Sequence, residues 1–186
     1  MVRTSTIKGS DKAANIGGFR GVTLNDVDEL LNRLSRAISP AFFQIFDAAR
    51  IAGWSHLYMA TVNAVGAFES GSSISRGLGI EMLLYASCQD QISRALDVVG
   101  VGPETENLAL VVLGEGPVEA EAAFGKTVGI LGEADDSVLG LDEIKFREIV
   151  KVFGVSENEL EAVGGERDKA LTSLLVEKGA LLPLRR

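Results

Sequence analysis

The 186-residue sequence contains one cysteine and one histidine, and this scarcity limits the chemistry open to it. The single cysteine, Cys88, cannot form an internal disulfide and leaves no cysteine-rich zinc site. Because disulfides belong to oxidising compartments, the composition favours a reducing cytoplasm. With His56 as the sole histidine, a metal centre would need carboxylates for nearly all its ligands, so we expect neither a metal site nor a cofactor.

Positive charge is also scarce: 18 Lys and Arg stand against 26 Asp and Glu, a formal net charge of −8. This balance argues against a broad basic surface that coats nucleic acid, and no DNA-specific binding is expected. The excess of acidic side chains lies in the second half of the chain. Residues 1–100 carry nine basic and nine acidic side chains, whereas residues 101–186 carry nine basic and seventeen acidic ones. The first half can therefore contact a polyanion locally.

An apolar signal segment is missing from the N-terminus, so export is not expected. The charge-free run of 18 residues at 51–68 is long enough to raise a membrane span. His56 and Asn63 lie inside this run, and a single span offers such polar groups no partners. We expect a helix at the centre of a soluble core instead, and no membrane partner.

Hydrophobic patterning predicts an α/β (α+β) fold in one domain. We expect a small, mostly antiparallel or mixed sheet of about four strands within residues 1–132, about seven or eight helices, and a helical C-terminal part at about 138–186. Strands are predicted around Ile7 and at 41–46, 79–87 and 108–114, the last a continuous apolar run that needs cover on both faces. Helices are predicted at 24–37, 53–69, 89–99, 118–131, 141–153, 156–163 and 166–182.

Smaller signals refine this prediction. Thr23 is expected to cap the first helix, and Ser156 with Glu159 to form a capping box. The glycines at positions 17, 18 and 21 indicate a loop after the first strand. In the helix at 89–99 we expect the apolar residues to face inward, namely Ile92, Leu96 and Val99.

Two features of the sequence raise enzyme hypotheses. Cys88 could act as a thiol nucleophile with His56 as its base, although a lone cysteine is more often buried and inert. The stretch LALVVLGEGPVEAEA has a strand, G-x-G and a helix in the order of a nucleotide site. It lacks the third glycine of a dinucleotide fingerprint and the lysine of a phosphate loop, so it does not support nucleotide binding.

A polar cluster between residues 72 and 94 is the better candidate for binding. Ser75 and Arg76 lie at a predicted helical turn, where backbone N–H groups and a guanidinium can hold an anionic group. Gln89 and Gln91 begin the next helix and supply amides that can hydrogen-bond to base edges. On spacing alone, however, the pattern favours the structural interpretation, in which the serines are caps and Arg76 is solvated.

The block HLYMATVNAVGAFESGSSISRGLGIEMLLYASCQDQIS, residues 56–93, resembles the central block of the kinase-binding subunits of the KEOPS complex, the TPRKB (PRPK-binding protein) family, of the archaeal type. The strand LALVVLG, the helix DEIKFREIVKVFGVSENEL and the closing LLVEKGALLPL are similar, in order, to its later blocks. Asp90 and Cys88 depart from the family pattern, where these positions are often basic and glycine. The resemblance covers most of the chain.

This resemblance implies a non-catalytic, cytoplasmic subunit of a tRNA-modifying assembly, without a cofactor or catalytic residues. Its expected partners are the small atypical kinase-ATPase of the complex (PRPK-like) and tRNA, which it would hold by the 3′ CCA end in support of threonylcarbamoylation. The tail-binding residues it implies are Ser75, Arg76, Gln89 and Gln91, with Arg76 on phosphate and the glutamines on bases. We expect the kinase to contact the C-terminal helix through Leu171, Leu174, Leu175, Leu181 and Leu182. The alternatives are a pure protein-interaction module without tRNA contact and a small Cys/His enzyme.

Overall fold

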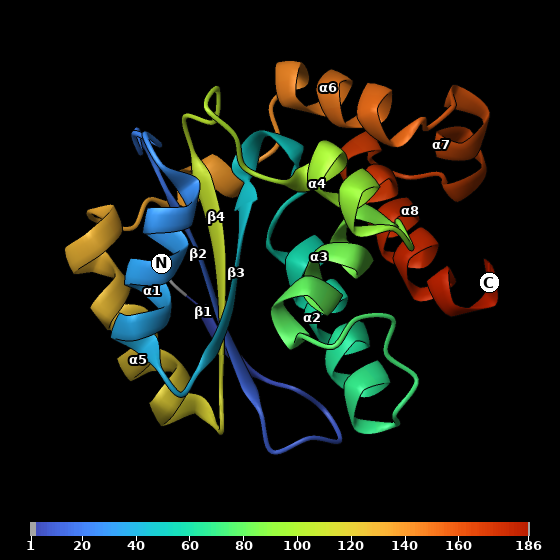
Figure 1. The fold of residues 1–186 in the computed structure, drawn as a ribbon. Coiled ribbons are helices and arrows are strands. Elements are labelled where there is room, and N and C mark those ends of the chain that lie inside the picture. The colour runs from blue at the N-terminus through green and yellow to red at the C-terminus, as the bar shows by residue number, and fades with distance from the viewer. Residues whose placement is uncertain (1–2, 186) are drawn as a thin grey trace.

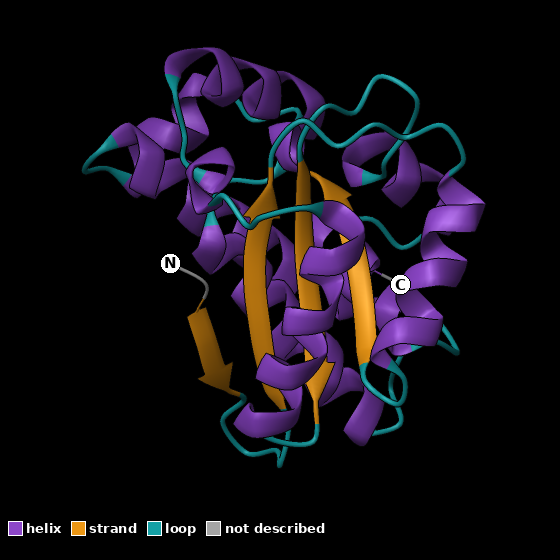
Figure 2. Cartoon of the chain, turned by 90° about the vertical axis from the view of Figure 1, so that its left-hand side faces the viewer, coloured by secondary structure: helices purple, strands orange, loops and turns teal. Residues whose placement is uncertain are grey.

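The computed structural model, which describes residues 3–185, has one antiparallel sheet with helices against both faces (Figure 1). The strands are β1 (Arg3–Thr6), β2 (Ala13–Phe19), β3 (Phe42–Asp47) and β4 (Leu108–Gly114). Their order in the sheet is β1-β2-β4-β3, and each neighbouring pair is antiparallel. The short strand β1 forms one edge, as Figure 2 shows from the side of α1 and α5, and β3 forms the other. The predicted α/β class and the small antiparallel sheet are confirmed.

Eight α-helices surround this sheet. They are α1 (Val27–Ile38), α2 (Trp54–Glu69), α3 (Leu78–Ser87), α4 (Ile92–Val99), α5 (Pro117–Leu131), α6 (Glu143–Phe153), α7 (Glu157–Val163) and α8 (Arg167–Ala180). Three short 3₁₀ turns complete the described chain: η1 (Ala48–Arg50), η2 (Asp136–Leu139) and η3 (Leu182–Arg185). Helices α1 and α5 cover one face, whereas α2 and α3 cover the other, with α8 packed outside them (Figure 1).

The central strand β4 shows why the sheet needs cover on both sides. All seven of its residues are buried. Leu108, Leu110 and Val112 belong to the core under α1 and α5, whereas Ala109, Val111 and Leu113 belong to the core under α2 and α3. The side chains of a strand alternate between faces, so a continuous apolar run fits a strand between two helical layers, as predicted.

The strand predicted at 79–87 is wrong, because this segment forms α3. Nearly every residue of α3 is buried, including Met82, Leu83 and Leu84 at 0% exposure. The helix lies between β3, α2, α4 and α8, which cover it on all sides. A helix buried all round has no polar stripe, so its sequence shows a continuous apolar run and not a helical period.

The loop predicted from the glycines at positions 17, 18 and 21 is wrong for the first two, because Gly17 and Gly18 lie in β2, whereas Gly21 follows the strand in a loop with φ 65°. A Cβ atom at Gly17 would lie 2.6 Å from Cζ of Phe124 on α5, and one at Gly18 would lie 2.3 Å from Cγ2 of Val138 on η2. These glycines therefore allow α5 and η2 to pack closely against the sheet, and they do not form a turn.

Two details at the helix ends differ from expectation. The cap of α1 is Asp26 and not Thr23, since the Asp26 side chain accepts the N–H of Glu29. In α4, Ile92 and Leu96 point outward with 46% and 49% exposure, because the helix packs on α3 through Ala95 and Val99. The capping box of Ser156 and Glu159 at the start of α7 is confirmed.

Candidate functional site

The segment between α2 and α3, residues 70–77, is held in place by a buried carboxylate. Glu81 in the first turn of α3 is 0% exposed. Its oxygens accept the backbone N–H of Ile74 at 2.9 and 3.0 Å and that of Ser75 at 2.7 Å. The Ser75 hydroxyl donates to the carbonyl of Gly77 at 2.8 Å. Because a carboxylate away from water is stable only when its oxygens are hydrogen-bonded, these contacts fix the loop in one conformation.

Arg76 is the charged group that this loop presents. Its side chain is exposed, and no hydrogen bond or ion pair joins it to any residue in 3–185. The next residue, Gly77, begins α3 without a side-chain cap. The first backbone N–H groups of a helix favour negative charge. Because Glu81 already accepts the N–H groups of Ile74 and Ser75, a phosphate group at this end of α3 would depend on the Arg76 guanidinium and the first N–H groups of the helix.

Gln89 and Gln91 lie at the opposite end of α3. Cys88 ends the helix in the left-handed conformation, with φ 56°, and the chain then turns into α4. Gln89 is half-buried and Gln91 is exposed. The ten residues of α3 span about 15 Å, so the structure separates Ser75 and Arg76 from the two glutamines instead of bringing all four into one pocket.

The C-terminal leucines do not form the exposed face that we expected. Leu171, Leu174 and Leu175 are buried in the cluster formed by α6, α7 and α8, and Leu182 is 2% exposed in the core of α2 and α3. The expectation fails for these four because α8 packs against α2 and α3 on one side and α7 on another. Leu181 alone among the five is exposed, at 40%.

His56 has a structural position that excludes it as a base for Cys88. Its Nδ1 accepts the N–H of Ala52 at 3.2 Å, so its Nε2–H donates to the carbonyl of Ala86 at 2.9 Å. Burial lowers the pKa of His56 from 6.5 to about 4, against the raising effect of the Ala86 carbonyl, and the charge of Lys145 lowers it further. The Cys88 thiol is buried and donates to the carbonyl of Leu175 at 3.3 Å. The two residues therefore do not form a catalytic pair.

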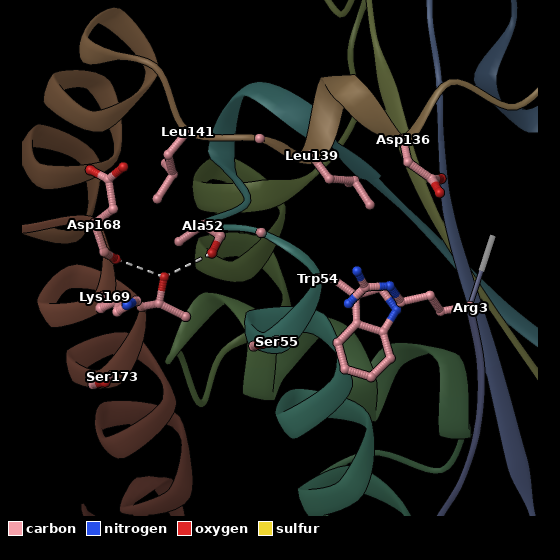
Figure 3. A pocket seen from close by; sticks show the side chains of 13 residues that line it. Arg3, Ala52, Trp54, Ser55, Asp136, Leu139, Leu141, Asp168, Lys169 and Ser173 are labelled. Atoms are coloured by element: carbon pink, nitrogen blue, oxygen red, sulfur yellow. Dashed lines mark hydrogen bonds between the residues drawn. The ribbon is translucent and has the colours of Figure 1, made fainter. Parts of the chain in front are cut away.

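A cleft of about 680 Å³ opens between the start of α2, η2 and α8 (Figure 3). Its basic groups are already engaged. The Arg3 guanidinium lies 5.9 Å from the centre of the Trp54 ring, and Lys169 pairs with Glu166 at 2.8 Å. The Thr172 hydroxyl donates to the carbonyl of Ala52 at 3.0 Å, which ties α8 to the start of α2 across the cleft floor. The cleft therefore offers no free positive charge comparable with Arg76, whereas the exposed Asp168 carboxylate in its lining is negative.

The acidic excess of the chain lies mainly around β4 and α5. Residues 101–136 carry eight acidic side chains and one basic side chain. Lys12 and Arg20 pair with two of these carboxylates, Glu115 and Asp135. Helix α5 lies on the sheet face opposite to α3 (Figure 1). The Arg76 loop thus lies on the sheet face opposite to α5, with Glu69 at the end of α2 as the acidic residue next to it in the chain.

Other classes of site find no support within residues 3–185. No group of three or more histidine, cysteine or acidic side chains is arranged to hold a metal ion. No described helix combines the length and the apolar composition that crossing a bilayer requires. In the G-x-G turn after β4, the Glu119 carboxylate accepts the N–H of Glu115 at 3.0 Å, which occupies the amide that a phosphate would need.

Three residues of interest escaped the sequence-based reasoning. Glu81 could have been found as an acidic residue inside an apolar run, because a buried charge needs a specific partner. Leu184, 78% exposed, follows Leu181 by three residues in η3. Phe42 is 44% exposed at the start of β3, and only the position of α3 reveals this.

Comparison with known proteins gives two matches. The sequence profile of the family described as "Kinase binding protein CGI-121" matches residues 19–180. A relative described as "Regulatory protein Cgi121", from Methanocaldococcus jannaschii, is 31% identical over 155 residues, which cover 80% of this chain and 93% of that protein.

Proposed function

The chain belongs to the CGI-121 family of kinase-binding proteins, and from this membership we propose that it is a non-catalytic regulatory subunit of the cytoplasmic KEOPS assembly. In this role it binds the small atypical kinase of that assembly and holds the 3′ CCA end of tRNA during threonylcarbamoylation. The observation that carries the kinase-binding part is the family match over residues 19–180. The tRNA part rests on the unpaired Arg76 and the fixed loop that presents it.

We assign the kinase contact to the C-terminal turn η3. Leu182 is buried and anchors this turn to the core, while Leu181 and Leu184 project outward with 40% and 78% exposure. Exposed apolar side chains on a fixed turn supply the anchors of a protein interface. The buried leucines of α8 contribute by holding the helix that precedes the turn.

Co-purification with the cognate kinase tests this assignment. Leu184→Asp is expected to lower the affinity at least about tenfold, because a charge enters an apolar contact. Ile144→Asp is the matched control, since Ile144 on α6 has the same 78% exposure. Equal effects of the two substitutions, or no effect of either, would remove η3 from the kinase interface.

We place the tRNA tail at the Arg76 end of α3. Ser75 shapes the loop, Arg76 holds a phosphate, and Gln89 and Gln91 contact bases at the far end of the helix. Adjacent nucleotides of a stacked strand rise about 3.4 Å, so the length of α3 corresponds to about four nucleotides. A single-stranded tail needs a few cations, amides and stacking surfaces and no large basic field, which agrees with the net charge of −8.

Binding of intact tRNA and of tRNA trimmed of its CCA end tests the tail assignment. Intact tRNA should bind more tightly, and Arg76→Ala should remove this advantage and flatten the salt dependence by about 0.7 in log–log slope. Arg33→Ala removes an equal charge from α1 on the opposite sheet face and should have no such effect. If both tRNAs bind the parent chain alike, the subunit is a protein-interaction module without tail contact.

A further inference from the structure

Phe42 is an exposed aromatic side chain at the first position of edge strand β3. It is 44% exposed, whereas Phe46 on the same strand is 0% exposed. Side chains of a strand alternate between the two faces, so Phe42 shares its face with Gln44 and Phe46. Phe46 belongs to the core under α2 and α3, which identifies this face as the one that α3 covers.

The first turn of α3 reaches β3 directly beside Phe42. A Cβ atom at Gly79 would lie 2.6 Å from the carbonyl oxygen of Phe43 and 3.3 Å from Oε1 of Gln44. The helix therefore covers Gln44 and the residues beyond it, and it begins too late to cover Phe42. Arg76 lies two residues before the start of the helix, at the same end of α3.

We propose that Phe42 is the stacking surface for one base of the RNA tail whose phosphate Arg76 holds. The inference rests on the proposed tRNA function. It adds an aromatic side chain for base stacking, which the proposed tail-binding residues do not include. Stacking on an aromatic ring together with a cation for the phosphate is the usual way in which proteins bind unpaired nucleotides without a large basic surface.

The surroundings of Phe42 favour a nucleobase over an apolar protein side chain. Three polar or charged groups lie at this end of α3, next to the half-buried Ile74 and Ile80: Gln44 is half-buried, Ser75 is half-buried, and Arg76 is exposed without a partner in the described chain. The other half-exposed phenylalanine of the strand, Phe43, belongs to the core of the opposite sheet face. An exposed ring and an unpaired cation at the same end of α3 suit the flat base and the charged phosphate of one nucleotide.

Fluorescence anisotropy with intact and CCA-trimmed tRNA tests the proposal. Phe42→Leu keeps an apolar side chain but removes the ring, and it should weaken binding of intact tRNA about 5- to 100-fold while leaving trimmed tRNA unchanged. Phe42→Trp should retain or improve the binding of intact tRNA. Val163→Ala on α7, with 42% exposure, is the matched surface control. Far-UV circular dichroism should be the same for all of these variants.

The outcomes separate this proposal from the function on which it rests. If Arg76→Ala weakens binding of intact tRNA and Phe42→Leu does not, the stacking role is refuted and tail binding stands. If Phe42→Leu lowers the affinity for the kinase and not for tRNA, the ring belongs to a protein interface and the proposal is refuted. If the parent chain binds intact and trimmed tRNA alike, tail binding and stacking both fail.

Discussion

Protonation of His56 should be a main cause of lost stability in mild acid. Burial holds its pKa at about 4 in the folded chain, whereas the imidazole of an unfolded chain has a pKa of 6.5. Between these two values the unfolded state binds a proton that the folded state does not. The contribution of the neutral His56 ring to stability is therefore complete above about pH 7 and is lost as the pH drops through 6.5. This loss levels off below about pH 4, where the folded state also binds the proton.

The size of this effect follows from the two pKa values. Their difference corresponds to about 3 kcal/mol when fully expressed, and about 2 kcal/mol of it is lost between pH 7.5 and pH 5. Urea unfolding followed by the fluorescence of Trp54, the single tryptophan, measures this loss. His56→Gln removes the titrating ring, so its unfolding free energy should change by about 2 kcal/mol less over the same pH interval. Carboxylates titrate alike in both proteins and cancel in this comparison.

A direct spectroscopic test is available because the chain has one histidine. The imidazole signals in an NMR titration belong to His56 alone, and they should stay constant from pH 8 to pH 5. A midpoint near 6.5, or an equal pH dependence of stability in the parent and His56→Gln, would refute the neutral, doubly hydrogen-bonded ring.

Three further predictions concern the same helical layer. Glu81→Gln places an amide donor against backbone donors and should cost about 2–4 kcal/mol in urea unfolding; a smaller change than 1 kcal/mol would mean that the carboxylate does not hold the loop. Gly79→Ala should lower the free energy of unfolding by about 1–3 kcal/mol, because the new Cβ would lie 2.6 Å from the Phe43 carbonyl oxygen. The control is Gly125→Ala in α5, where no atom lies within 4 Å of the new Cβ, and it should stabilise the protein by about 0.5–1 kcal/mol. Cys88 should react slowly with an alkylating reagent at pH 7 until the chain unfolds, and fast labelling of the native chain would show an accessible thiolate.

Elements with one clear physical signal could be predicted from the sequence. Strand β4 is apolar throughout because both of its faces are covered, and α7 has its capping box in the sequence. The long charge-free segment forms α2 as predicted, with His56 and Thr61 buried among its apolar residues and hydrogen-bonded to backbone carbonyls.

The errors arose where tertiary contacts outweigh local pattern. The segment 79–87 has the composition of a strand because four neighbouring elements bury it as a helix. Positions 17 and 18 carry glycine because α5 and η2 approach the sheet too closely for a side chain, and in the sequence such a glycine pair is typical of a loop. In both cases the residue type is set by a partner distant in the sequence, which no local window contains.

The candidate site was predictable only in its charged part. Arg76 is proposed from the sequence because it follows a serine-rich turn before an apolar segment, and the structure shows that its side chain is exposed. Whether Leu174 or Leu181 is exposed depends on how α8 packs, and the exposure of Phe42 depends on where α3 begins. Periodicity along one helix does not reveal how many of its sides are covered.

The concentration of carboxylates around α5, on the sheet face opposite to α3, makes the charge distribution of the molecule uneven. In the field of a polyanion an uneven charge distribution experiences a torque, which turns the strongly acidic face away before any contact is made. The field decays over about 8 Å at physiological ionic strength, so this pre-orientation acts in the last stage of approach and weakens as salt is added. A surface with little positive charge of its own can thus meet a polyanion in a suitable orientation more often than by random collision.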